Sequence, residues 1–341
     1  MDSEISHLLD LWRDRAHRFE SEVCRAVVGL EKAVRLITIG LFSRGHLMLE
    51  GDVGVGKTTL LRAVARGLGG AYERIEGTVD LMPADLVYHT YINEQGRPQV
   101  DPGPVLRHGQ ELSVFFFNEV NRARPQVHAL LLRIMAERSV TAFNQEFQFP
   151  HLQIFADRNR VEREETFEIP SAARDRFMME IHISSPQDPV LLRELVFNPR
   201  FHDVDQLIAL VGPEVLPYRE IAGFAPMIQR QVASSEALET YALALWSATR
   251  NPSLFGIELE GVDMHRFVLS GASPRGMSML LRAAKVHAWL EKRSHLVPED
   301  LHAVFREVIA HRIFLQPVYE LRRETLIGSF IDQLVSKVPV P

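Results

Sequence analysis

The chain has 341 residues, of which 46% are hydrophobic and 24% charged, with a formal net charge of −6 at pH 7. This balance is typical of a soluble protein of two domains, and the acidic net charge argues against broad nucleic-acid binding. No run of about 18 apolar residues occurs, the acidic start Met1–Ile5 does not resemble a signal peptide, and Cys24 is the only cysteine, so we expect a cytoplasmic protein without membrane spans or disulfides.

The first predicted elements are two helices within residues 4–45, separated by a turn at Val27-Val28-Gly29. The apolar segment Leu47–Glu50 then predicts a short buried strand. Directly after this strand, Gly51–Thr58 reads GDVGVGKT and fits the phosphate-binding pattern G-x-x-x-x-G-K-[ST].

A helix is predicted over Thr59–Arg66, ending at Gly67, so the loop has the strand–loop–helix context that the motif requires. Backbone N–H groups of the loop and the positive end of the helix are suited to bind the phosphates of ATP or ADP. We expect Lys57 on the β- and γ-phosphates and the Thr58 hydroxyl on Mg²⁺. No other metal site is expected, because the histidines and the cysteine show no ligand spacing.

Strands alternate with helices from Leu47 to about Ser184. Short apolar segments predict four further strands, at residues 72–75, 113–117, 153–156 and 178–183. The predicted fold class is therefore α/β, with a parallel sheet covered by helices.

Two segments of this part predict β-hairpin insertions. One spans residues 86–100 around Asn93–Gly96, and the other spans residues 140–149 around Asn144–Glu146. They are either ordinary surface loops or elements that contact other proteins, and the pattern leaves both interpretations open.

The pattern changes after residues 185–189. Apolar residues then recur at helical spacing, for example Leu238, Tyr241, Ala242, Leu245 and Trp246. We therefore predict a nucleotide-binding core over residues 1–187 and a smaller, all-helical domain over residues 188–341.

A phosphate-binding loop needs a second strand with acidic residues at its end, because one carboxylate holds the hydrated Mg²⁺ and another activates water. The predicted strand Val114–Phe117 runs into Asn118 and Glu119. Glu119 is the expected general base, the alternative being an ordinary exposed carboxylate at a strand end. Asn118 is expected to hold Mg²⁺ through water, but its amide carries no negative charge and so tightens the metal shell less than an aspartate.

Three polar residues further along the chain complete the predicted catalytic set. Asn159 follows a strand and is expected to orient the attacking water. Arg176 precedes a strand and is expected to reach the γ-phosphate of a neighbouring subunit. Arg275 lies at a helix start after Ser273, a predicted N-cap, and Pro274. Each arginine alone is more often a surface ion-pair residue, and their order behind the loop is what favours a catalytic role.

The order of these motifs resembles that of AAA+ ATPases, and their detail resembles the MoxR family. The resemblance covers roughly residues 23 to 315, and the matching stretches are Gly45–Gly51, the loop itself, Asp101–Pro104, Asn118–Ala123, Asp175–Phe177, Thr249-Arg250 and Gly271–Arg275. Together with Gln126–His128 and Ala156–Arg160, the stretch Asn118–Ala123 is most similar to the branch associated with methanol dehydrogenase maturation in methylotrophic bacteria.

The resemblance implies a role for each site residue: Lys57 and Thr58 as Walker A, Asn118 and Glu119 as Walker B, Asn159 as sensor 1, Arg176 as arginine finger and Arg275 as sensor 2. Arg174 is a second candidate for the finger. The predicted nucleotide-binding residues are Gly51, Asp52, Val53, Gly54, Val55, Gly56, Lys57, Thr58, Thr59, Val28 and Gly29.

The resemblance also implies a homo-oligomeric ring, usually a hexamer, with ATP bound between subunits. It places both hairpins at the central pore or against a partner. Family members act with von Willebrand factor A domain proteins to activate or metallate client enzymes, and methanol dehydrogenase is the client implied here.

Two functions compete with an ATP-driven remodelling chaperone. Asn118 favours a nucleotide-gated assembly scaffold that binds ATP but hardly hydrolyses it, and in that case Asn118→Asp would raise turnover sharply. A DNA-acting AAA+ protein is the other alternative, and the acidic net charge and the lack of a DNA-binding module argue against it.

Overall fold

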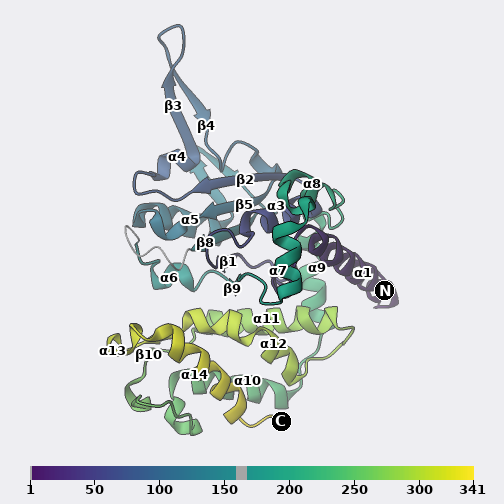
Figure 1. The fold of residues 1–341 in the computed structure, drawn as a ribbon, viewed down its shortest axis with the longest axis vertical. Coiled ribbons are helices and arrows are strands. Elements are labelled where there is room, and N and C mark those ends of the chain that lie inside the picture. Colours follow the sequence, from purple (N-terminus) through teal and green to yellow (C-terminus); the bar gives the residue numbers. More distant parts are fainter. Residues whose placement is uncertain (1, 159–166) are drawn as a thin grey trace.

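The computed structural model describes residues 2–158 and 167–341, with an α/β layer above a helical layer in the view of Figure 1. The chain opens with two helices, α1 (Asp2–Ala26) and α2 (Glu31–Phe42), as predicted. The turn between them contains Gly29 at φ +75°, where a Cβ atom would lie 2.7 Å from the Pro186 side chain. This turn therefore lies directly against the segment that leaves the sheet.

The centre of the first domain is a five-stranded sheet in which all neighbouring strands are parallel, in the order β2-β5-β8-β1-β9. The prediction of five strands is confirmed, with ends that differ by two residues at most: β1 (Leu47–Glu50), β2 (Ala71–Glu76), β5 (Leu112–Asn118), β8 (Gln153–Arg158) and β9 (Met179–His182). Because the strands are parallel, all their carboxyl ends lie at one edge of the sheet.

Both faces of this sheet are buried, and side chains alternate between two hydrophobic clusters. Phe116 contributes to the cluster that contains Phe19 of α1. Phe115 and Phe117 contribute to the cluster on the other face. Burial on both sides explains why the central strands β1 and β5 appear in the sequence as apolar runs, whereas the edge strand β2 is half-exposed and carries charged residues.

Helices and short 3₁₀ turns connect the strands of the first domain: α3 (Lys57–Leu68), α4 (Pro83–Val87), α5 (Pro125–Glu137), α6 (Ser171–Arg174), and 3₁₀ turns at Gly109–Glu111 and Val120–Arg122. The predicted end of the first of these helices at Gly67 is wrong, because α3 continues to Leu68 and Gly69 follows it at φ +72°. Gly67 is needed for close packing instead, since a Cβ atom there would lie 2.6 Å from the Phe19 ring.

Both predicted hairpins are present, but their boundaries differ. In the first, β3 (Tyr88–Ile92) pairs with β4 (Pro98–Pro102), and every residue of both strands is exposed. Leu86 and Val87 were predicted in the first strand but end the short helix α4, where they are buried. Figure 1 shows this hairpin projecting from the body of the molecule.

In the second hairpin, β6 (Ser139–Ala142) pairs with β7 (Gln145–Gln148). The predicted turn at Asn144–Glu146 is wrong, because the turn is Phe143-Asn144, with φ of +52° and +58°. Two-residue hairpin turns of this kind need positive φ at both positions, a conformation that the sequence signals at Asn144 but not at a phenylalanine.

The second part of the chain is mainly helical, with a small antiparallel pair of strands that the prediction of an all-helical domain did not include. Its elements are α7 (Pro189–Phe197), α8 (Val204–Ala209), α9 (Tyr218–Gln231), α10 (Glu236–Arg250), β10 (Val268–Ser270), α11 (Pro274–Leu290), α12 (Pro298–Ile309), β11 (Phe314–Leu315), α13 (Pro317–Glu320) and α14 (Arg323–Lys337), with 3₁₀ turns at Pro199–His202, Pro252–Phe255, Met264–Arg266 and Ala310–Arg312.

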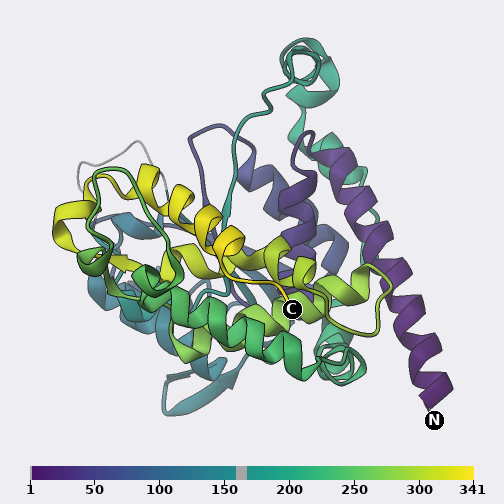
Figure 2. The same cartoon turned by 90° about the horizontal axis from the view of Figure 1, so that it is seen from below.

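These helices fall into two groups according to the elements that they contact. Helices α8 and α9 contact α1, α2 and α3 of the first domain, whereas α11 and α12 contact each other and reach α2 and β9. Seen from below, the later helices cover one side of the α/β layer, and α1 runs along its flank (Figure 2). Within the described residues, no helix combines the length and apolar character needed to cross a bilayer.

Candidate functional site

The glycine-rich loop connects the carboxyl end of β1 to the start of α3. Gly56 stands directly before the helix at φ +88°, and a Cβ atom on it would meet nothing within 4 Å. Asp52, Val53 and Gly54 are exposed, so the loop is accessible. At its base, Gly51 lies so close to the segment after β9 that a Cβ atom would be 2.1 Å from the Ile183 carbonyl oxygen.

Lys57 is held by two oxygen atoms at the first turn of α3. Its Nζ lies 2.7 Å from the Gly51 carbonyl oxygen and 2.9 Å from Oδ2 of Asp157. Asp157 is 1% exposed and lies on β8, level with Leu49 of β1. Its other oxygen, Oδ1, accepts a short hydrogen bond from the backbone N–H of Glu119. One buried carboxylate therefore connects the loop lysine to the predicted catalytic strand.

Asp157 was not among the site residues predicted from the sequence. The residue predicted on this segment was Asn159, which lies outside the described residues. The sequence does show an acidic residue at the end of a predicted strand, which is a signal for a site residue. The sequence does not show the order of the strands, and only this order places β8 between β1 and β5.

Asn118 ends β5 and Glu119 follows it, beside this carboxylate, so the predicted second strand end lies next to the loop. Asn118 is buried, and its backbone carbonyl oxygen accepts a hydrogen bond of 2.8 Å from the backbone N–H of Gly77. Glu119 has φ +52°, and its Oε2 accepts a hydrogen bond of 2.9 Å from Arg122. This structure therefore shows Glu119 in a defined orientation set by an ion pair.

The turn at Val28-Gly29 lies close to the base of the loop. Gly51 approaches Ile183, and Gly29 approaches Pro186, only three residues further along the same segment. Three residues span at most about 10 Å, so this turn borders the loop region. The predicted nucleotide-contacting residues of the turn and of the loop therefore lie in the same region of the structure.

The predicted arginines lie elsewhere. Arg176 comes just before β9, and its guanidinium donates only a long hydrogen bond, 3.4 Å, to the Ala172 carbonyl among the described residues. Because β9 runs parallel to β1, the segment before β9 and the loop after β1 lie at opposite edges of the sheet. Arg174 turns inward over the Phe314 ring at 5.3 Å, and burial lowers its pKa to about 10.

Arg275 meets the same segment from the second domain. Ser273 caps α11 by accepting from the Gly276 N–H, which confirms the predicted N-cap, and Pro274 begins the helix. Arg275 then donates to Asp175 Oδ2 at 3.1 Å, and the Ser273 hydroxyl donates to Asp175 Oδ1 at 2.7 Å. Arg275 therefore lies beside the Arg176 segment and not beside the loop lysine of its own chain.

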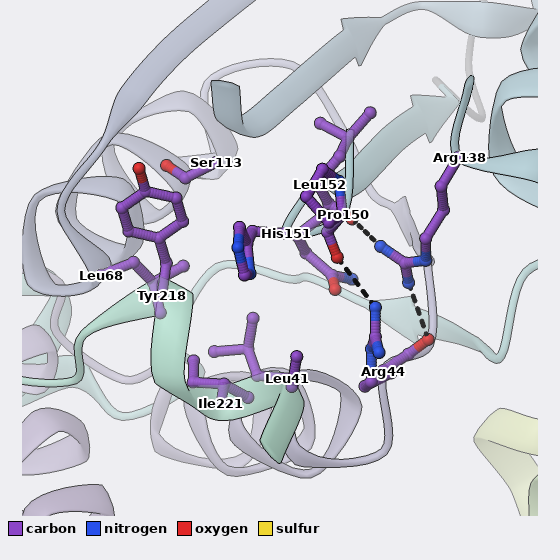
Figure 3. A pocket seen from close by; sticks show the side chains of 12 residues that line it. Leu41, Arg44, Leu68, Ser113, Arg138, Pro150, His151, Leu152, Tyr218 and Ile221 are labelled. Carbon is purple, nitrogen blue, oxygen red and sulfur yellow. Dashed lines mark hydrogen bonds between the residues drawn. The ribbon is translucent and has the colours of Figure 1, made fainter. Parts of the chain in front are cut away.

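A separate pocket lies at the amino edge of the sheet (Figure 3). Arg44 donates to the Pro150 carbonyl at 2.8 Å, and Arg138 donates to the Arg44 carbonyl at 3.3 Å. Burial and the charge of Arg44 lower the pKa of His151, which favours its neutral form. None of the predicted site residues lines this pocket, so it is distinct from the nucleotide site.

The residues at the carboxyl edge fit a nucleotide with its metal. The loop offers accessible backbone N–H groups, Lys57 offers a positive charge, and Thr58 and Asp157 offer oxygen atoms of the kind that Mg²⁺ and its water shell prefer. Among the described residues no group of three or more histidine, cysteine, aspartate or glutamate side chains is placed to hold a metal by itself.

Comparison with known proteins identifies the family and the fold. Residues 46–179 match the family described as ATPase family associated with various cellular activities (AAA), and residues 263–327 match the AAA lid domain. A crystal structure of a candidate ATPase from Cytophaga hutchinsonii superimposes with a TM-score of 0.83 at 29% identity, covering 100% of this chain and 99% of that one.

Three curated relatives share the name MoxR. Protein MoxR of Methylorubrum extorquens is 62% identical over 98% of this chain and 97% of its own length. Protein MoxR of Paracoccus denitrificans is 54% identical over 100% and 99%, and chaperone MoxR1 of Mycobacterium tuberculosis is 33% identical over 86% and 74%. The chain therefore belongs to the MoxR family of AAA+ ATPases.

Proposed function

We propose that this chain is an ATP-hydrolysing chaperone that works as a ring and remodels or activates a client enzyme. The observation that carries the proposal is the meeting of Lys57, Asn118 and Glu119 at one edge of the sheet, next to an accessible phosphate-binding loop. An ATPase and chaperone-like function is also what the family relationship supports.

In this proposal the loop residues Gly51–Thr59 bind the phosphates, and Val28 and Gly29 border the base. Glu119 removes a proton from the attacking water once its carboxylate is released from Arg122. Asn159 orients that water. Mg²⁺, when bound through Thr58 and, by way of water, through Asn118, would neutralise charge that develops on the phosphates.

The position of the arginines supports a site that is shared between subunits. Arg176 and Arg275 lie at the edge opposite to the loop of their own chain, and Arg174 is half-buried over the Phe314 ring. We therefore assign Arg176 as the finger, acting on the nucleotide of a neighbouring subunit in a ring, usually a hexamer. Arg275 would act at the same junction.

The client assignment rests on sequence resemblance. The branch that this chain resembles is associated with methanol dehydrogenase maturation, so we propose methanol dehydrogenase as client and a von Willebrand factor A domain protein as partner. The exposed hairpin β3–β4, with Tyr91 and Ile92 at the surface, is the proposed contacting element. Co-purification from the native cell, followed by identification of the bound chains, tests this assignment.

The test of the activity is Glu119→Gln. The substitution keeps the size and the hydrogen bonding of the side chain but removes the base, so phosphate release should fall by about 100-fold or more while ATP still binds. The measurement compares phosphate release with binding of a fluorescent ATP analogue. Unchanged turnover in this variant would show that Glu119 is not the base.

A second function is favoured by two observations. Asn118 is neutral, and Glu119 is paired with Arg122, so a scaffold that binds ATP and hydrolyses it very slowly fits the same residues. Single-turnover kinetics separates the two functions, because a scaffold retains bound ATP for as long as the complex is followed.

A further inference from the structure

Asp157 is a buried carboxylate that the roles assigned above do not explain. It is 1% exposed, and its two oxygens have different partners, the Lys57 ammonium at 2.9 Å and the backbone N–H of Glu119. A buried carboxylate is tolerated when it is paired and hydrogen-bonded, and Asp157 meets both conditions through Lys57 and the Glu119 N–H.

In the sheet, Asp157 lies next to Asn118, the residue that stands uncharged where a carboxylate was expected. In the parallel register Phe117 of β5 faces Ala156 of β8, so the following residues, Asn118 and Asp157, are neighbours at the strand ends. On its other side β8 pairs with β1, which leads into the loop. The carboxylate therefore lies between the loop lysine and the neutral Asn118.

Nucleotide binding changes the environment of this carboxylate. Phosphates compete with Asp157 for the Lys57 ammonium, because both are anions within reach of the same group. When the ammonium turns toward phosphate, Asp157 is left as a buried charge that needs a new cation. A hydrated Mg²⁺ that arrives with the nucleotide is the cation available at this edge.

We propose that Asp157, on β8, supplies the carboxylate that holds the hydrated Mg²⁺ of the bound nucleotide, in place of the neutral Asn118 on β5. Asn118 then serves as a hydrogen-bond acceptor for the same water shell. This inference rests on the proposed nucleotide site. Asp157 is a positioning residue, because it acts through Lys57 and metal-bound water and not on the reacting phosphate.

The alternative is a purely structural role, in which Asp157 only orients Lys57 and the Glu119 backbone. The two roles differ in what restores function. A structural role needs a carboxylate at position 157, whereas a metal-holding role needs one carboxylate at either of two adjacent strand ends.

The experiment compares the unaltered chain with Asp157→Asn, Asn118→Asp and the exchange variant Asp157→Asn/Asn118→Asp. Each binds a fluorescent ATP analogue in Mg²⁺ and in EDTA, and the ratio of the two dissociation constants measures the contribution of the metal. Electron paramagnetic resonance of Mn²⁺ with ADP gives a second, activity-independent readout. Asp205→Asn is the matched control, because the Asp205 side chain is 80% exposed and forms a surface ion pair with Arg62.

We expect Asp157→Asn to lose about 10- to 100-fold of the metal-dependent gain in affinity while binding in EDTA stays close to that of the unaltered chain. The exchange variant should recover most of this gain, and Asp205→Asn should change nothing. Asn118→Asp alone should add little to the metal-dependent gain in affinity, because Asp157 already supplies the carboxylate of the site.

Three results would overturn the inference. The first is an unchanged ratio in Asp157→Asn. The second is an exchange variant that melts like the unaltered chain but recovers no metal dependence. The third is a large gain in Asn118→Asp alone, since it would show that the natural site lacks a carboxylate. If the unaltered chain binds no nucleotide in either buffer, the proposed function itself fails and this inference falls with it.

Discussion

Two buried polar side chains, Asp157 and His46, are held in the protein interior in different ways. Asp157 is stable inside the protein because Lys57 and a backbone N–H group compensate its charge. His46 represents the other solution, in which a buried group stays neutral. Its Nδ1 accepts from the Ile154 N–H at 3.0 Å, and its Nε2 lies 3.3 Å from the Met135 carbonyl oxygen.

His46 makes stability depend on pH. Burial lowers its pKa to about 3, whereas an unfolded histidine titrates near about 6.5, so only the unfolded state takes up a proton as the pH falls below that value. The contribution of His46 is complete above about pH 6.5 and is lost below it, by about 1.4 kcal/mol per pH unit. His311 is buried, its pKa is lowered in the same direction, and it adds to the effect.

His46→Gln isolates this effect, because glutamine can keep one donor and one acceptor but does not titrate. Urea unfolding of both proteins is measured between about pH 6.5 and pH 5. The unfolding free energy of the variant should fall less steeply with pH, with a slope smaller by up to about 1.4 kcal/mol per pH unit, because one fewer proton is taken up on unfolding. Identical slopes for the two proteins would contradict the assignment of His46 as neutral in the folded state.

At the scale of elements, apolar runs predict the three central strands β1, β5 and β8 most directly, because these strands are buried on both faces. Local patterns could not show the order of those strands, and this is why Asp157 was missed. They also could not show that Phe143 adopts positive φ or that Leu86 belongs to a helix. Each of these depends on contacts between distant segments.

Gly67 shows how such a contact determines a residue. It lies inside α3 against Phe19 of α1, so Gly67→Ala should lower the free energy of unfolding by about 1–3 kcal/mol through overpacking. The matched control is Gly223→Ala in α9, where a Cβ atom meets nothing within 4 Å. There alanine should stabilise by about 0.5–1 kcal/mol, because it favours the helix. Denaturant titration measures both, and equal effects of the two substitutions would refute the packing argument.

At the scale of the whole molecule, the two edges of the sheet carry complementary halves of the predicted site. The carboxyl edge carries the loop, Lys57 and Glu119, and the opposite edge carries Arg176. The second domain reinforces this division, because Arg275 and the buried Arg312 both bind Asp175 beside the arginine segment. Motifs in the sequence named these residues, but only the sheet topology separates them within one chain.

This division predicts that Arg176→Ala still binds ATP but loses hydrolysis, by about 10³-fold or more, since the arginine stabilises charge in the transition state. The matched control is Arg200→Ala, an exposed arginine that lies over the Phe201 ring. It should leave both binding and turnover unchanged.

Mixing two inactive variants tests the central claim of a shared ATP site most directly. Glu119→Gln chains keep Arg176, and Arg176→Ala chains keep Glu119, so each supplies the half that the other lacks. We predict that the two variants, exchanged into common assemblies, release phosphate from ATP well above the sum of their separate rates. A mixture that stays as inactive as its components, in assemblies shown to contain both chains, would contradict a site built from two subunits.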